Sequence, residues 1–167
     1  MPTLTISALY DYFESFSREL KAINHIDDGA KPSFMDDEEF VEKKDNVKYP
    51  CMVLDIPDIT PVDEGSENYQ DYFDCGVTVF YEFNEKGRYA NMRKALDNSR
   101  AVLRSVMARL RKDDKLPSSV VHNMFKVADV QRLERIQHSS SNIIGFRMPF
   151  LLKPHLDLSE DETELIL

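Results

Sequence analysis

The chain contains two cysteines and four histidines, the side chains most often used as nucleophiles, bases and metal ligands. Cys51 and Cys75 lie inside apolar stretches, where strand packing accounts for them, and their separation matches no zinc-ligand spacing. The histidines occur singly, without an HExxH motif or a pair at helical ligand spacing; they are His25, His122, His138 and His155. We therefore expect packing and surface roles for these residues.

Acidic residues are the other chemical candidates, because paired carboxylates can hold Mg²⁺ for phosphodiester cleavage. Glu42 and Lys44 form an ExK triplet and Pro57–Asp58 supplies a PD dipeptide, but their order is reversed relative to the usual nuclease pattern. The sequence also lacks a GxSxG nucleophile elbow. Solvated loop carboxylates are the simpler interpretation. The sequence thus predicts no catalytic residue, no metal site and no cofactor.

The composition is that of a globular chain. The 167 residues are 42% hydrophobic and 31% charged. No apolar run approaches the roughly 18 residues of a membrane span, and the opening residues lack the features of a signal peptide. The net charge of −9 disfavours general binding to nucleic acid or membranes. We expect one domain over residues 1–156, an acidic tail over 157–167, and a reducing cytoplasmic setting.

Two amphipathic helices are predicted from apolar residues at spacings of three and four. The first covers residues 5–24, with Thr3 or Thr5 as its N-cap, and the second covers 88–112 with Ser99 as the one polar residue on its apolar seam. The expected core residues of these helices are Phe13, Phe16, Leu20, Leu96, Leu103 and Leu110.

Alternating apolar residues predict strands, of which residues 71–84 are the clearest. Phe80 breaks the alternation on the polar face of that strand, so another element is expected to cover the centre of this face. Segments 27–48 and 57–70 are predicted as a loop or edge strand and as a surface loop, respectively. The other expected strands are 49–56, 120–127, 130–136 and 143–153. Together these elements predict an α/β (α+β) fold, in which a mostly antiparallel or mixed sheet packs against two main helices.

Charge is unevenly distributed along the chain. Residues 88–112 hold eight basic residues against the single acid Asp97, a local charge of +7, so the remainder carries −16. At about 100° per residue, four arginines of this segment fall within about 40° of one another, beside the apolar seam. They are Arg93, Arg100, Arg104 and Arg111, called the basic stripe below.

The basic stripe has two interpretations. A solvated helix face with its stems over the core margin is the simpler one. Alternatively, the stripe meets an acidic surface of another subunit or faces DNA. Opposite charges on one chain favour contact between subunits. The expected acidic partners lie in segment 36–45 and include Asp36, Asp37, Glu38 and Glu39.

The order of these elements resembles that of the tail terminator (tail completion) proteins of long-tailed phages and related contractile injection machines. The resemblance covers about residues 5–156 and is carried by YPCMVLDI at 49–56, DCGVTVFYEF at 74–83 ahead of the long helix, and NIIGFRMPF at 142–150. It implies an α/β domain that forms a ring, usually of six copies, capping the tail tube and joining it to the neck or head. The acidic region 27–48 and the apolar-ended tail depart from the family, which leaves open a different ring of the neck.

The resemblance also implies partners and a location. Tail-tube proteins and neck or head-completion proteins would adjoin the ring, DNA would pass through its lumen without sequence-specific binding, and the protein would reside in the virion away from membranes. An alternative class is a small intracellular adaptor that binds a partner through helix 88–112. A nuclease acting through Glu42 or Asp58 is the third hypothesis. Segments 57–70 and 155–167 are expected to order against neighbours.

Overall fold

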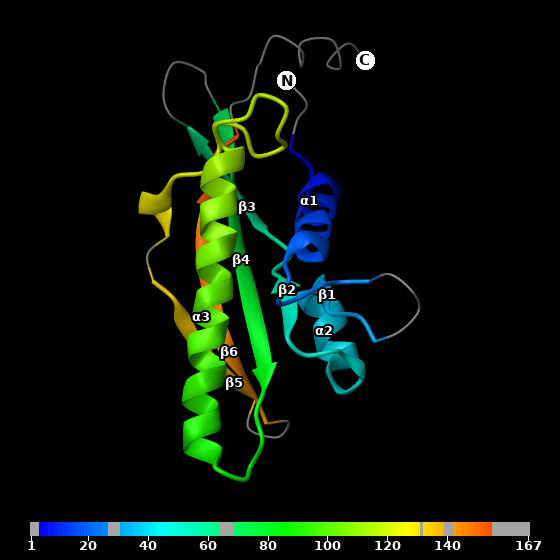
Figure 1. Cartoon of the computed structure of the whole chain (residues 1–167). Coiled ribbons are helices and arrows are strands. Elements are labelled where there is room, and N and C mark those ends of the chain that lie inside the picture. Colours follow the sequence, from blue (N-terminus) through cyan, green and yellow to red (C-terminus); the bar gives the residue numbers. More distant parts are fainter. Residues whose placement is uncertain (1–3, 27–30, 64–68, 131, 139–141, 155–167) are drawn as a thin grey trace.

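The computed structural model describes residues 4–26, 31–63, 69–130, 132–138 and 142–154. The chain forms one sheet with helices packed on it, which confirms the predicted α+β class (Figure 1). In chain order the elements are α1 (Ile6–Glu19), β1 (Phe34–Asp36), α2 (Asp37–Lys43), the 3-10 helix η1 (Lys44–Asn46), β2 (Cys51–Leu54), β3 (Asp58–Asp63), β4 (Tyr69–Glu82), α3 (Arg88–Asp113), the 3-10 helix η2 (Val127–Asp129), β5 (Glu134–His138) and β6 (Ile143–Leu152).

The strands form one mixed sheet in the order β1-β2-β4-β6-β5, with β3 also paired to β4. Only the β1–β2 pair is parallel among the described strands. Strand β4 is the hub, because β6 follows one of its sides over ten residue pairs while β2 and then β3 follow the other. The sheet therefore has one edge formed by β1 and β3 and an opposite edge formed by β5.

Helices α1 and α3 pack side by side on one face of the sheet (Figure 1). The predicted seams are confirmed: all but two of the six expected helix residues are buried, and Leu20 and Leu96 are partly buried. Thr5 caps α1, since its Oγ1 accepts from Ala8 N at 3.1 Å. Helix α1 ends at Glu19, earlier than predicted, because Leu20 already has an extended backbone, with φ −73° and ψ 112°.

Helix α2 covers the centre of the opposite face and corrects the prediction for residues 27–48. The acids of its first turn lie where the positive helix end stabilises them, and Asp36 Oδ1 accepts from Glu39 N at 2.8 Å. Phe40 is buried and stacks on Phe80 with ring centroids 4.9 Å apart. The prediction that another element covers Phe80 is confirmed. Segment 27–48, predicted as a loop or edge strand, contains the edge strand β1, but the helix α2 was not predicted.

Two further predictions were wrong. Segment 57–70 contains β3, which pairs with β4 and accommodates Pro61 because the strand lies at a sheet edge there. Segment 120–127 is a series of turns with one isolated bridge, Phe125 to Leu152, and β5 starts four residues later than the strand expected at 130–136. Segment 57–70 was predicted as a loop because acids and prolines are rare in strands. Segment 120–127 was predicted as a strand because β-branched residues are common in strands.

The contact between α3 and the sheet includes an unusual hydrogen-bond bridge. The Ser99 hydroxyl donates to the Val79 carbonyl oxygen at 2.7 Å and accepts from Phe146 N at 2.9 Å, so it stands between paired residues of β4 and β6. Gly145 lies beside this bridge, and a Cβ there would overlap the Val79 carbonyl oxygen. This explains why the apolar seam of α3 carries a serine.

Candidate subunit interface

Helix α3 presents the basic stripe to solvent along its length. Its apolar residues face the sheet, and the four stripe arginines are all exposed. From Arg93 to Arg111 the stripe extends about 27 Å at 1.5 Å per residue. Within the part of the chain that the structure describes, none of the four makes an ion pair. The stripe is therefore an uncompensated cationic surface.

Arg109, in contrast, belongs to a structural network that joins α3 to α1. Its Nε lies 2.6 Å from Asp113 Oδ2 and its Nη1 lies 2.6 Å from Glu19 Oε2. The Tyr12 hydroxyl also donates to Asp113 Oδ2, at 2.9 Å, and burial together with that carboxylate raises the pKa of Tyr12. This arginine locks the two helices together and is not available to a partner.

An apolar groove of about 390 Å³ opens beside the middle of the stripe. We call it the α3 groove. Its rim carries three cations, and its apolar lining comes from α3, the segment around η2, and β6. The rim residues are Arg100, Arg104 and Arg132, and the apolar ones are Leu103, Met107, Val127, Val130, Leu133 and Met148. Because Arg132 and Leu133 immediately precede β5, the groove lies toward the β5 edge of the sheet.

The acids predicted to meet the stripe lie around the start of α2, and three of the four already have bonds. Asp36 caps the helix, Asp37 Oδ1 accepts from Ile56 N at 2.9 Å, and Glu39 lies 2.6 Å from Lys43 Nζ. Glu38 is exposed. The structure thus brings the four acids together at the end of β1, each with a different role.

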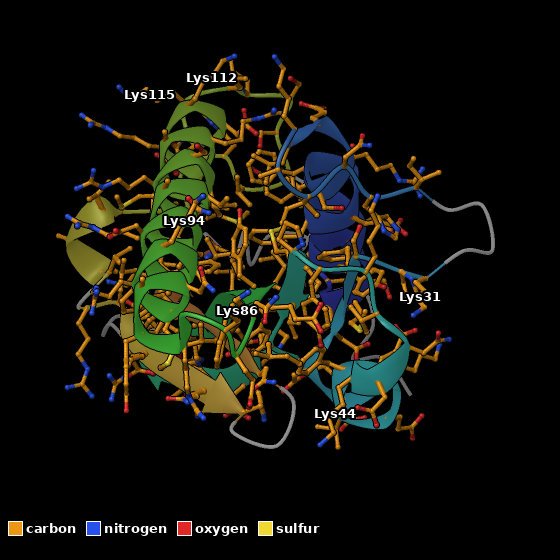
Figure 2. The ribbon with its side chains drawn as sticks, turned by 60° about the horizontal axis from the view of Figure 1, so that its bottom comes forward. Lys31, Lys44, Lys86, Lys94, Lys112 and Lys115 are labelled. Carbon is orange, nitrogen blue, oxygen red and sulfur yellow. The ribbon has the colours of Figure 1, made fainter. Side chains whose placement is uncertain are left out.

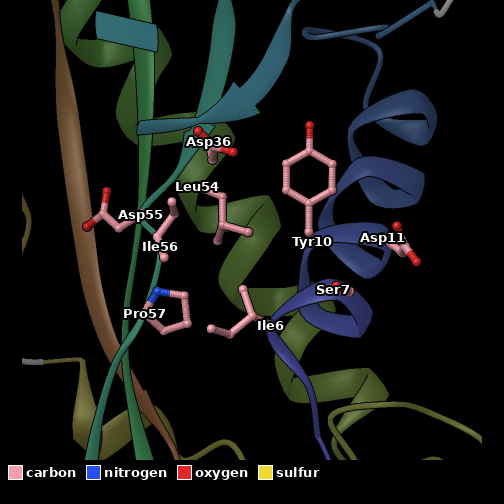
Figure 3. Close-up of a pocket in the computed structure, with 9 residues that line it drawn as sticks. All are labelled: Ile6, Ser7, Tyr10, Asp11, Asp36, Leu54, Asp55, Ile56 and Pro57. Atoms are coloured by element: carbon pink, nitrogen blue, oxygen red, sulfur yellow. The ribbon is translucent and has the colours of Figure 1, made fainter. Parts of the chain in front are cut away.

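Asp36 also borders an acidic hollow of about 340 Å³ between α1 and the β2–β3 connection (Figure 3). The α1 side supplies Ile6, Ser7, Tyr10 and Asp11, and the strand side supplies Asp36, Leu54, Asp55, Ile56 and Pro57. Ile6 and Ile56 are 43% and 40% exposed, so apolar surface remains open between the carboxylates. The Asp55 carboxylate points away from the hollow, toward Arg147, so Asp11 and Asp36 are the anions left for a cation (Figure 3). The apolar walls suit the stem of an arginine or lysine.

Asp55 is held in place by an ion pair with Arg147 of β6, on the sheet face opposite to the hollow. Its Oδ2 lies 2.7 Å from Arg147 Nε, and Arg147 Nη1 lies 3.0 Å from Glu134 Oε2. Burial raises the pKa of the Asp55 carboxyl, against the opposing effect of the Arg147 guanidinium. A Cβ on Gly76 would overlap this ion pair, which explains the glycine in the middle of β4.

The two charged surfaces lie at opposite edges of one sheet. The acidic hollow takes residues from β1 and β2 at one edge, and the α3 groove with the stripe borders the segment that leads into β5 at the other. In Figure 2, nitrogen-tipped side chains project from the α3 side away from α1 and α2. A single subunit therefore cannot bring its own stripe and hollow together.

The other candidate chemical residues do not converge. Cys51 and Cys75 are buried on opposite faces of the sheet, Glu42 lies on α2, and Asp58 lies on β3. His25 is buried against Ser33, while His155 lies outside the described residues. Across the described ranges no group of three or more His, Cys, Asp or Glu side chains is arranged to hold a metal ion.

The buried thiols carry a direct prediction. Burial raises the pKa of both Cys51 and Cys75, so the reactive thiolate is scarce and inaccessible. At about pH 8, iodoacetamide is expected to modify neither thiol in the folded protein, while both react in urea, as mass spectrometry would show. Rapid alkylation of either thiol in the folded state would contradict this placement.

Sequence reasoning missed half of the candidate interface. It identified the stripe from helical spacing, but Asp11, Asp55 and Arg132 come from distant segments that only the folded sheet brings to their sites. No sequence signal pointed to the hollow, because only the fold shows that Ile6 and Ile56 are exposed.

Comparisons with protein-family models, curated proteins and solved structures gave no match for the chain. No helix within the described residues has the length and apolar character needed to cross a membrane.

Proposed function

We propose that this protein is a structural virion subunit that forms a ring, of six copies, capping a phage tail tube and joining it to the neck or head. The observation that carries the proposal is the separation of charge: an uncompensated basic stripe at the β5 edge and an acidic, apolar-walled hollow at the β1 edge. Different patches that complement each other make head-to-tail contacts, which close into a ring when the rotation between subunits is suitable.

In this arrangement the stripe of one subunit lies against the α1–α2 side of the next. An arginine stem would cover Ile6 and Ile56, and its guanidinium would meet Asp11 or Asp36. Exposed ion pairs are worth only about 0.2 to 1 kcal/mol each, so the contact depends on several pairs and on the apolar surface between them. The charges mainly set the orientation of the subunits.

Reversing two stripe charges tests the proposal. The wild type should form rings in negative-stain microscopy and have the corresponding solution mass. The double variant Arg100→Glu, Arg104→Glu should remain folded by circular dichroism but form no rings. Salt at about 1 M, where the Debye length is about 3 Å, should weaken the wild-type ring as well.

The matched control is Lys94→Glu, Lys112→Glu, the same charge change on α3 but about 100° around the helix axis from Arg93 and Arg111. Figure 2 labels both lysines. This control should still form rings. Adding Asp11→Lys and Glu38→Lys to the stripe variant restores attraction and should restore rings. Normal assembly of the stripe variant would refute the charged interface.

A second candidate function is a small adaptor that binds an acidic partner through α3, which the exposed stripe also favours. The two differ in solution mass: an adaptor stays monomeric at every concentration and salt, whereas a ring subunit assembles.

A further inference from the structure

We infer that the α3 groove is the docking site of the chain's own acidic segment 155–167 in the free subunit. The inference concerns the unassembled protein and does not rest on the proposed ring. In sequence, the segment has five acidic residues, no lysine or arginine, and five apolar residues. The acids are Asp157, Glu160, Asp161, Glu162 and Glu164, and the apolar residues are Leu156, Leu158, Leu165, Ile166 and Leu167.

The α3 groove offers the complementary surface. Val127 is 42% exposed, and Met107, Val130 and Leu133 are only partly buried, so the groove presents apolar area to solvent. Arg100 and Arg104 are exposed, and Arg132, at 77% side-chain exposure, lies 3.4 Å from its partner Glu134. The leucines of segment 155–167 would pack on the apolar lining of the groove, and its carboxylates would pair with the arginines on the rim.

The other hollows suit the segment less well. The hollow beside α1 is bordered by Asp11 and Asp36, and the one at the β4–α3 connection includes Glu82 and Glu85, so both would repel the segment. A more open basic hollow near the end of α3 is lined by Arg111, Lys112 and Lys115 but has only Ala108 and Leu116 as apolar lining. Of these four hollows, the α3 groove alone combines cations with an extensive apolar lining.

Segment 155–167 is covalently attached to the subunit whose groove it would occupy, which strengthens otherwise weak contacts with the groove. Pro154 ends the described chain and is buried, and Met148 of the groove lies six residues earlier, about 20 Å along an extended strand. Thirteen extended residues span up to about 43 Å, so segment 155–167 reaches the groove of its own subunit. Tethering gives an effective concentration of about millimolar, which favours the chain's own segment over that of a free copy.

Docking in this way has a regulatory consequence. The segment would cover Arg100 and Arg104, so a neighbouring subunit would have to displace it before using those residues. The segment would thus act as an internal competitor that delays association.

Paramagnetic broadening of methionine methyl signals tests the inference in the full-length protein, at a concentration where the solution mass is that of one subunit. A nitroxide on Ser159→Cys is the probe, and the burial of Cys51 and Cys75 makes the introduced thiol the reactive one. The Met107 methyl should lose its signal, while Met35, buried under α2 on the opposite face, should keep it. Loss of neither signal would overturn the inference.

Charge variants locate the site. Arg100→Glu, Arg104→Glu should restore the Met107 signal, and adding Glu160→Lys, Glu162→Lys should remove it again. The matched reversal Lys112→Glu, Lys115→Glu should have no effect, and if it alone restores the signal, the groove assignment is wrong. Mixing nitroxide-bearing protein with isotope-labelled protein lacking the nitroxide should leave Met107 sharp. Broadening in that mixture would assign the docked segment to a second copy and overturn the inference.

Discussion

Replacing Gly145 by alanine is expected to destabilise the protein by about 3 kcal/mol, the upper end for overpacking. The added Cβ would overlap the Val79 carbonyl oxygen, which is backbone and cannot rotate away. Moving that oxygen would also disturb the Ser99 bridge, because the same oxygen accepts from the Ser99 hydroxyl. Equilibrium unfolding in urea measures the change.

Gly76→Ala is the matched control for this prediction. Its Cβ would meet side-chain atoms of Asp55 and Arg147, which are 20% and 29% exposed and can move toward solvent. The loss should therefore be smaller than at Gly145. An equal loss for the two variants would show that the close approach of β4 and β6 at Gly145 is not the determining feature.

Replacing Leu103 by alanine is expected to lower the free energy of unfolding by about 2 to 5 kcal/mol, as buried leucine truncations do. Leu103 is 1% exposed and belongs to the main core between α3 and the sheet. Leu116→Ala provides the same chemical change at a position that is 43% exposed, and it should cost much less. A melting temperature unchanged by Leu103→Ala would contradict the orientation of α3.

The main helices and central strands were predictable because each has a strong local signal. Spacings of three and four placed Phe13 and Leu103 in the core, and alternation along β4 identified both of its faces. The break at Phe80 even predicted a cover on the second face. These signals come from neighbours in sequence, so no tertiary information was needed.

Short elements were harder to predict because distant contacts stabilise them. Helix α2 has seven residues, most of them charged, and its formation depends on the Asp36 cap and on Phe40 packing against Phe80. Strand β3 exists because it continues along β4 where β2 stops. The candidate interface divides in the same way: the stripe follows from helical spacing, whereas the hollow combines residues of α1 with residues of β1 and β2.

The pairing of β4 with β6 has a kinetic consequence for the whole fold. β3 and β4 pair across a short connection, but the paired residues of β4 and β6 lie about 60 to 80 positions apart, with α3 between them. Closing the longer loop has an entropic free-energy cost about 2 kcal/mol higher than closing the short one. We therefore expect the β3–β4 hairpin to form first and the addition of β6 to limit the folding rate. Until then one side of β4 is an open edge, which could pair with another chain, so in the proposed ring the docking of β6 would have to precede assembly.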